Sequence, residues 1–151
     1  MVNSEIRILH DADGTPVANV SFDLSAEQLA ATARVTEAVR LERHQNLELS
    51  TDEVLAMREL TGVADELHRL AEHGAHGTVV LQLARFTALH DALSEWVHAA
   101  DERGWMRDED AAAYPLIEAL LGPMADLRAE ALHAVLGDSD RAGRQDAEHR
   151  F

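Results

Sequence analysis

The residues between Leu83 and Ala100 form the stretch around which we expect the rest of the chain to be arranged. Apolar residues recur there at steps of three and four, which places them on one stripe of an α-helix. The stripe comprises Phe86, Leu89, Leu93, Trp96 and Ala100. Two of the six aromatic residues of the chain lie on it, and aromatic side chains bury the most area per residue. We therefore expect the other helices to pack against this one.

Two segments near the N-terminus alternate between apolar and polar residues, as half-buried β-strands do. They cover residues 5–10 and 17–23. Between them, Asp13-Gly14 is typical of a tight turn, and Pro16 follows it. The pattern predicts a β-hairpin within residues 1–24.

Two capping boxes mark the start of the next two helices. Ser25 and Ser50 are each followed three residues later by a glutamine or a glutamate. The first helix extends to about Gln45 and is rich in alanine, which suits either close packing or a place at the periphery. The second extends to Gly74 and has a regular apolar stripe, made of Met57, Leu60, Ala64, Leu67 and Ala71.

A last helical region is expected from Asp108 to about Leu136. Pro115 and Pro123 interrupt it, so we expect a kink or two pieces. Residues 137–151 are polar and have no apolar period, which predicts a flexible or partner-dependent C-terminal tail.

These patterns predict a mainly α (α+β) fold with a single domain over residues 1–136. The β-hairpin of residues 1–24 precedes an antiparallel bundle of about four helices over residues 25–136. Short apolar segments that end at Leu24, Leu49 and Leu81 each lead directly into a helix. They either pair into a small sheet at one end of the bundle or serve as extended linkers, and the sequence leaves both interpretations open.

Composition excludes several kinds of chemistry. The chain has no cysteine and no lysine, since all 13 basic residues are arginine. Disulfides, thiolate catalysis, Schiff-base lysines and Walker-type lysines are therefore excluded. The sequence also lacks the Gly-x-Ser-x-Gly, His-Glu-x-x-His, Gly-x-Gly-x-x-Gly and calcium-loop motifs. The richness in alanine, leucine, arginine and aspartate is typical of high-GC bacterial coding.

The net charge of −15 disfavours nucleic-acid backbones and anionic membranes as partners. The acidic residues are spread over nearly every segment, which is typical of a solubilising surface rather than of nucleic-acid mimicry. The N-terminus lacks the basic and apolar regions of a signal peptide, and no apolar run approaches the roughly 20 residues that span a bilayer. We expect a cytoplasmic protein.

One histidine-rich cluster has the spacing of metal ligands. It consists of His68, Glu72, His73 and His76. Imidazole and carboxylate groups at this spacing bind divalent metals, but histidines at a helix C-terminus are also favoured by the helix dipole without any metal. No cofactor is predicted, and a divalent metal at this cluster is kept as an alternative.

A pair of Glu-x-x-His motifs resembles the ligand pattern of di-iron carboxylate bundles. These are Glu95 with His98 and Glu130 with His133. At ~100° per residue, they lie well away from the apolar stripes of their helices. We therefore expect all of these side chains to face solvent, where they do not form a buried di-metal centre.

The connection before the last helix contains candidate partner-binding residues, namely Trp105, Met106 and, shortly afterwards, Tyr114. Aromatic residues in an exposed connection anchor partner proteins. More often, such residues fold back and cover the end of the core.

The function that these observations favour is that of a non-enzymatic protein-binding or regulatory module that acts through protein–protein association, as a homodimer. Helix 25–46 carries no net charge and is the least self-repelling face for association. The first alternative is a metal-dependent enzyme or metal-binding protein that uses the His/Glu clusters. The second is an acidic inhibitor of the immunity or antitoxin type, which neutralises a basic protein partner.

Overall fold

The computed structural model describes residues 3–45, 48–73 and 77–149, with side chains up to Asp138. It confirms the predicted mainly α fold with a small antiparallel sheet. Along the chain the elements are β1 (Ser4–His10), β2 (Pro16–Leu24), α1 (Ala26–His44), α2 (Thr51–Glu72), β3 (Gly77–Gln82), α3 (Leu83–Arg103) and α4 (Asp108–His149).

The sheet has the order β1-β2-β3, and both pairings are antiparallel. Gly14 adopts a positive φ of 79° in the hairpin turn, where the Asp11 carboxylate accepts the N–H groups of Asp13 and Thr15. β3 lies on the other side of β2, with Leu81 opposite Val20. The apolar segments that end at Leu24 and Leu81 therefore pair in a sheet, which is one of the two interpretations that the sequence left open. Leu49 precedes α2 outside any strand.

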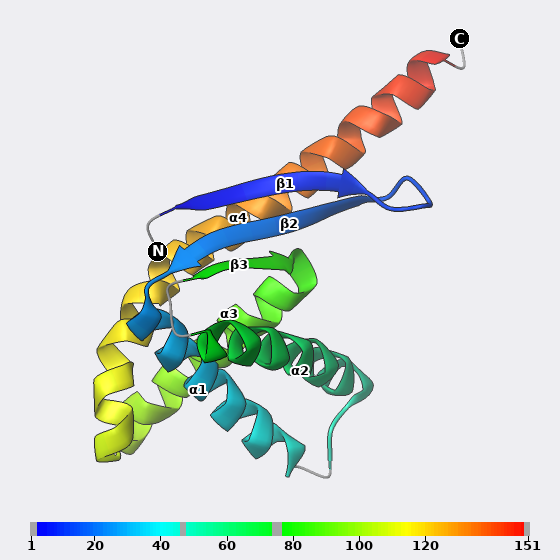
Figure 1. Ribbon diagram of the computed structural model, residues 1–151. Coiled ribbons are helices and arrows are strands. Elements are labelled where there is room, and N and C mark those ends of the chain that lie inside the picture. Colours follow the sequence, from blue (N-terminus) through cyan, green and yellow to red (C-terminus); the bar gives the residue numbers. More distant parts are fainter. Residues whose placement is uncertain (1–2, 46–47, 74–76, 150–151) are drawn as a thin grey trace.

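The helices cover one face of the sheet, and the other face is open (Figure 1). Alternate residues of β2 point into the helical layer and are buried, while those between them are only partly covered. The buried ones are Ala18, Val20, Phe22 and Leu24.

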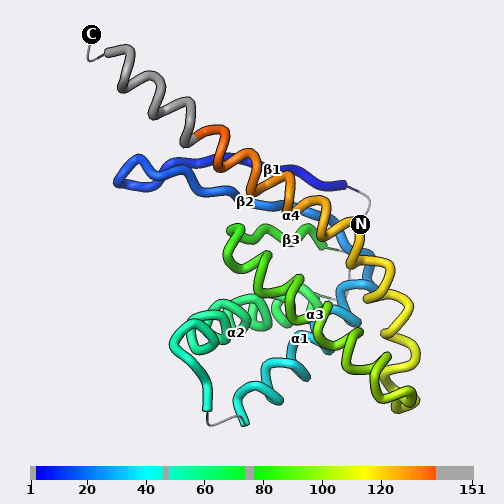
Figure 2. The backbone as a smooth tube through the Cα atoms, turned by 180° about the vertical axis from the view of Figure 1, so that it is seen from behind, coloured from blue at the N-terminus to red at the C-terminus, as the bar shows by residue number. Residues whose placement is uncertain are grey.

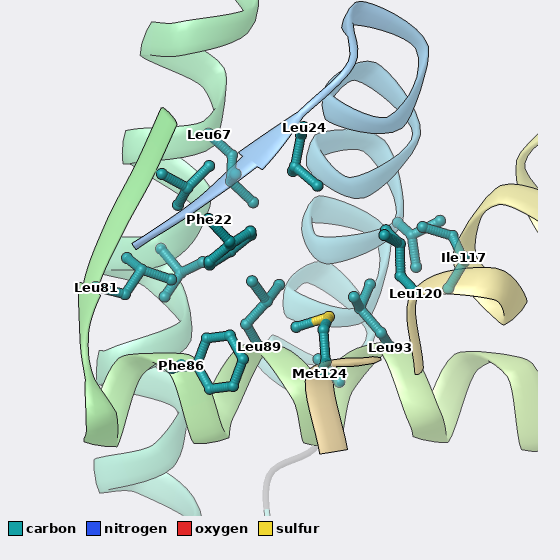
Figure 3. Packing of buried hydrophobic residues seen from close by; sticks show 14 of the residues in the cluster. Phe22, Leu24, Leu67, Leu81, Phe86, Leu89, Leu93, Ile117, Leu120 and Met124 are labelled. Carbon is teal, nitrogen blue, oxygen red and sulfur yellow. The ribbon is translucent and has the colours of Figure 1, made fainter. Parts of the chain in front are cut away.

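The largest core side chains meet where the sheet contacts α3 (Figure 3). The rings of Phe22 and Phe86 pack edge to face, with centroids 5.5 Å apart and an interplanar angle of 72°. Both side chains are at most 1% exposed. On α3 the predicted stripe faces inward, although Trp96 is only partly buried and its neighbour Val97 lies in the core.

The alanine-rich helix α1 lies inside the helical layer and contacts α2, α3 and α4. Its small side chains are therefore used for close packing, and Ala31, Ala33 and Val35 are buried. Part of the neutral surface of this helix is thereby covered, and dimerisation through its exposed face stays a prediction. Thr32 and Thr36 are also buried.

α4 is one helix that changes direction between its yellow and orange parts (Figures 1 and 2). The bend agrees with the predicted kink, since Pro123 cannot donate a backbone hydrogen bond. The helix continues to His149, beyond the predicted end at Leu136. Extending an existing helix is much easier than nucleating one, and the absence of an apolar stripe over residues 137–149 therefore did not mark an end. The predicted flexibility of residues 137–151 stays a prediction.

The described helices include none that is both long and apolar enough to cross a membrane.

Candidate functional site

The connection between α3 and α4 is fixed at both ends. At the end of α3, Gly104 adopts a positive φ of 71°, and its N–H donates to the carbonyl of Ala100 at 3.2 Å. At the start of α4, the carbonyl of Arg107 accepts the N–H groups of Asp110 and Ala111. Acidic residues fill the first turn of α4, where they suit the helix dipole. The two residues between these anchors, Trp105 and Met106, are therefore held on a short, defined segment.

The three predicted partner-binding residues differ in how far they are exposed. Trp105 is 62% exposed, although tryptophan is usually highly buried. Met106 is partly buried. Tyr114 is also partly buried, and its ring centroid lies 6.2 Å from that of Trp96. The end of the core is thus covered by Tyr114 and Trp96, while Trp105 remains largely exposed.

Tyr114 has a further contact that fixes its orientation. Its hydroxyl donates a hydrogen bond to the carboxylate of Asp101. This bond is the main reason that the pKa of Tyr114 lies well above its usual range, and the nearby carboxylate of Glu118 raises it further. The phenol therefore remains protonated, and its hydrogen bond ties the first turns of α4 to the end of α3.

Trp105 borders a cleft of about 410 Å³, which we call the Trp105 cleft. The end of α1, the end of α3, the connection and the first turn of α4 form its walls. Leu41 on α1 adds a second apolar side chain and is 48% exposed. The complete lining is Ala38, Leu41, Glu42, Gln45, Trp96, Arg103, Trp105, Arg107 and Asp110.

The charges at the Trp105 cleft differ from those over the rest of the chain. The guanidinium carbon of Arg103 lies 5.1 Å from the centroid of the Trp105 ring, in a cation–π contact. Within the described residues, neither Arg103 nor Arg107 forms a salt bridge. Of the two carboxylates in the lining, Asp110 is bound to Arg34 at 3.0 Å, and Glu42 is the other.

Most other arginines with described side chains are neutralised by a carboxylate. Their ion pairs are Arg7–Glu5, Arg34–Asp110, Arg40–Glu37, Arg43–Glu95, Arg69–Glu66, Arg85–Glu59 and Arg128–Asp91. In a chain with a net charge of −15, the Trp105 cleft therefore presents two arginines that lie outside every ion pair of the described residues, together with the carboxylate of Glu42, beside an exposed indole.

The predicted histidine cluster lies at the C-terminal end of α2. His68 and Glu72 are exposed on the helix, and His73 is its C-cap residue. His76 falls outside the described residues. Over the part of the chain that is described, no group of three histidine or acidic side chains is placed to hold a metal ion. The metal alternative, which includes His76, stays a prediction.

The paired Glu-x-x-His motifs face solvent, as their helical positions predicted. Glu95 binds Arg43 of α1, and His98 lies 3.2 Å from Glu102 of its own helix. On α4, Glu130 and His133 are both exposed. These side chains do not converge in the interior.

Comparison with protein-family models, curated proteins and solved structures finds no match to this chain. The functional argument therefore depends on the geometry of the molecule itself.

Sequence reasoning found Trp105 but missed Leu41, Arg103 and Arg107. A signal for Leu41 was present, because it lies about 200° around the helix from the buried Val39. No signal joined the end of α1 to the connection, since the two are about sixty residues apart and meet only through the packing of α1 against α3 and α4. 

Proposed function

We propose that this protein is a protein-binding module that recognises its partner at the Trp105 cleft. The observation that carries the proposal is the exposed indole of Trp105, held on a short connection beside Leu41 and two arginines that form no salt bridge within the described part of the chain. The proposal extends the association role that the sequence favoured and assigns a surface to it.

The side chains of the cleft are those that dominate binding energy in protein interfaces. Tryptophan and arginine are enriched at hot spots, which lie in pockets from which a partner excludes water. Trp105 and Leu41 already stand in water, so a partner would bury their apolar surface without first unfolding any part of the core. The fixed connection keeps the ordering cost low, because its backbone is hydrogen-bonded at both ends.

The charges indicate the chemistry of the partner. A carboxylate of the partner could accept hydrogen bonds from the guanidinium groups of Arg103 and Arg107, which have no acidic partner of their own among the described residues. The segment expected in the cleft therefore combines an apolar side chain, packed on Trp105 and Leu41, with an aspartate, a glutamate or a chain-terminal carboxylate.

A peptide-display selection on the full chain tests this proposal. Random peptides retained by the wild-type protein are measured again on the Trp105→Ala variant. We expect the retained peptides to combine an apolar residue with a carboxylate, and their affinity to fall about thirtyfold in the variant, as for a hot-spot residue. Arg103→Gln and Arg107→Gln are expected to weaken binding and to remove the preference for acidic peptides.

Leu132 provides the matched control. It is an exposed leucine on α4, 51% exposed, and similar in that respect to Leu41. It lies about 33 Å along the helix from Asp110, given a rise of about 1.5 Å per residue. Leu132→Ala should leave peptide affinity unchanged, whereas Leu41→Ala should lower it. Peptides that bind the Trp105→Ala variant as tightly as the wild type, or a selection that retains none, would contradict the proposal.

Neither alternative function gains a supporting observation from the described residues. The described members of the His/Glu clusters are exposed, and a metal-dependent enzyme remains a prediction from sequence. The acidic inhibitor of a basic partner also remains one. The arginines of the Trp105 cleft favour an acidic ligand, whereas an inhibitor of this type would bind a basic one.

A further inference from the structure

A second surface of the molecule, the outer edge of β1, has the features of a self-association site. β1 is the outermost strand of the sheet, and β2 lies on only one of its sides (Figures 1 and 2). No other segment of the described chain pairs with its free side. A strand edge of this kind presents unpaired backbone donors and acceptors to any chain that can align with it.

The hydrogen bonds to β2 show which residues of β1 face the free edge. The N–H of Asp23 donates to the carbonyl of Asn3 at 3.0 Å, which places the odd-numbered residues of β1 in the bonded pairs with β2. Residues in an antiparallel strand alternate between the two neighbours. The backbone groups of Ser4, Ile6 and Ile8 therefore point away from β2.

Two of the devices that usually block strand edges are absent from β1. The strand covers seven residues in unbroken register with β2, without a proline or a bulge. His10, at the end of the strand, pairs with Asp138 of α4 at 2.8 Å. The other two ionisable residues of β1, Glu5 and Arg7, pair with each other at 3.3 Å and are more than 60% exposed. An exposed pair of this kind contributes little to stability, so exchanging its partners costs little.

The two charges on β1 are self-complementary in one register. When an antiparallel copy of β1 is centred on Ile6, Glu5 of each copy lies opposite Arg7 of the other. A register centred on Arg7 places the two arginines opposite each other, and one centred on Glu5 does the same for the two glutamates. Like charges directly opposite are destabilising, and opposite charges stabilise the pair.

The apolar face of β1 agrees with the same register. Ile6 and Ile8 lie on the face that packs against the helical layer, where both are partly buried. A two-fold axis perpendicular to the sheet at Ile6 brings the two Ile6 side chains together on this face. Ser4 and Ile8 of one copy then exchange backbone hydrogen bonds with Ile8 and Ser4 of the other.

We propose that this protein forms a homodimer in which β1 pairs antiparallel with β1 of a second copy about a two-fold axis at Ile6. The two three-stranded sheets then become one continuous sheet. This interface differs from the alanine-rich helix considered in the sequence analysis, and it is separate from the Trp105 cleft. Its test therefore does not depend on the proposed function.

Charge exchange across the axis tests the register. Arg7→Glu places Glu5 opposite a glutamate on both sides of the axis, and Glu5→Arg places two arginines there. Each single variant should dimerise about tenfold more weakly than the wild type in analytical ultracentrifugation. The double variant Glu5→Arg/Arg7→Glu should recover the wild-type affinity. An equal mixture of the two single variants should form a heterodimer, because the opposite charges then face each other again.

A cysteine scan tests the position of the axis, since the chain contains no cysteine of its own. Directly opposite residues in a bonded antiparallel pair have Cα atoms about 5.5 Å apart, within disulfide range. With oxidised glutathione as the oxidant, Ile6→Cys should cross-link to itself. Ser4→Cys should not, because Ser4 lies opposite Ile8 of the second copy.

Three results would overturn the proposal. The first is sedimentation of the wild type as a monomer at high protein concentration. The second is a dimer whose affinity is unchanged by Arg7→Glu and by Glu5→Arg. The third is a dimer that Trp105→Ala dissociates, which would place the interface at the cleft. Circular dichroism verifies that each variant is folded.

Discussion

Two aromatic regions of this molecule are used in opposite ways. At the sheet, Phe22 and Phe86 pack edge to face and are almost completely buried. At the far end of α3, Trp96 and Tyr114 are partly buried, and Trp105 is 62% exposed. The aromatic area of the first region stabilises the fold, whereas much of that of the second remains in contact with water. Exposed aromatic area that the fold does not need is available to a partner.

The backbone explains the difference between the two regions. Phe22 and Phe86 lie on regular elements, where strand alternation and helical period both direct them to one interior. Trp105 lies between two helix ends, just after a glycine in the left-handed region. That glycine turns the chain away from the axis of α3, and Trp105 therefore leaves the apolar stripe.

Phe86→Ala should have the largest effect on stability and would break the sheet-side region. Removing a buried phenylalanine leaves a cavity and costs about 3–5 kcal/mol of unfolding free energy. Because a domain of this size is stabilised by only about 5–15 kcal/mol, the variant should be close to unfolding. Urea denaturation followed by circular dichroism measures the change. A loss below about 1 kcal/mol would show that Phe86 does not lie in a packed core.

Thr36→Val should stabilise the protein, because it removes a buried polar group from the core. The hydroxyls of Thr32 and Thr36 are buried in α1 and have no hydrogen-bond partner among the described residues. Valine has nearly the same shape and no polar group, so the variant should gain about 1 kcal/mol in the same denaturation experiment. Thr61→Val is the control, because the Thr61 hydroxyl donates to the carbonyl of Met57 and its loss should not stabilise. Destabilisation by Thr36→Val would indicate that the hydroxyl is satisfied.

His90 should make stability depend on pH at the junction of α3 and α4. Burial, and then the charge of Arg128, lowers the pKa of His90 from its ordinary value of 6.5. As the pH falls below 6.5, the unfolded chain takes up a proton at His90 before the folded chain does. The contribution of His90 to stability is therefore present above that pH and lost below it.

His90→Gln supplies the comparison for this pH effect. The variant should lose less stability than the wild type when the pH is lowered through 6.5, as measured by urea denaturation on either side of that pH. The neutral imidazole accepts a hydrogen bond from Arg128 at 3.2 Å, and glutamine can also accept one. Equal pH dependence in the two proteins would assign the effect to other groups.

The smallest effect on stability is expected for Trp105→Ala, within about 0.5 kcal/mol of the wild type, because surface substitutions away from packed features are nearly neutral. Trp96→Ala should cost more, since that ring packs on Tyr114. The same denaturation series provides both values. If Trp105→Ala were the more destabilising of the two, Trp105 would belong to the core and the contrast between the regions would fail.

Periodicity and capping residues predicted most of the fold. The hairpin, both capping boxes and the inward stripe of Phe86, Leu89 and Leu93 follow from local spacing alone. The third strand remained one of two interpretations, because residues 79–81 find their partner more than fifty residues away in β2. The central place of α1 was also open, since alanine suits both a close contact and an exposed face.

The candidate site was predicted only in part. Trp105 was identified by its residue type and its place in a connection. Its exposure depends on Gly104 and on Tyr114 covering the end of the core in its place, which spacing does not reveal. Arg103 and Arg107 could be recognised as part of the site only once the ion pairs of the other arginines were known. Such pairs join segments that are distant in sequence, as in Arg43–Glu95.

Collisional quenching of Trp105 fluorescence tests the central claim most directly. In a Trp96→Phe variant, Trp105 is the only tryptophan, and iodide and caesium report the sign of the charge around it. With Arg103 and Arg107 beside the indole and outside every ion pair of the described residues, iodide should quench more efficiently than caesium despite the net charge of −15, and Arg103→Gln/Arg107→Gln should reverse that order. A blue-shifted emission that neither ion quenches, or stronger quenching by caesium, would contradict the account.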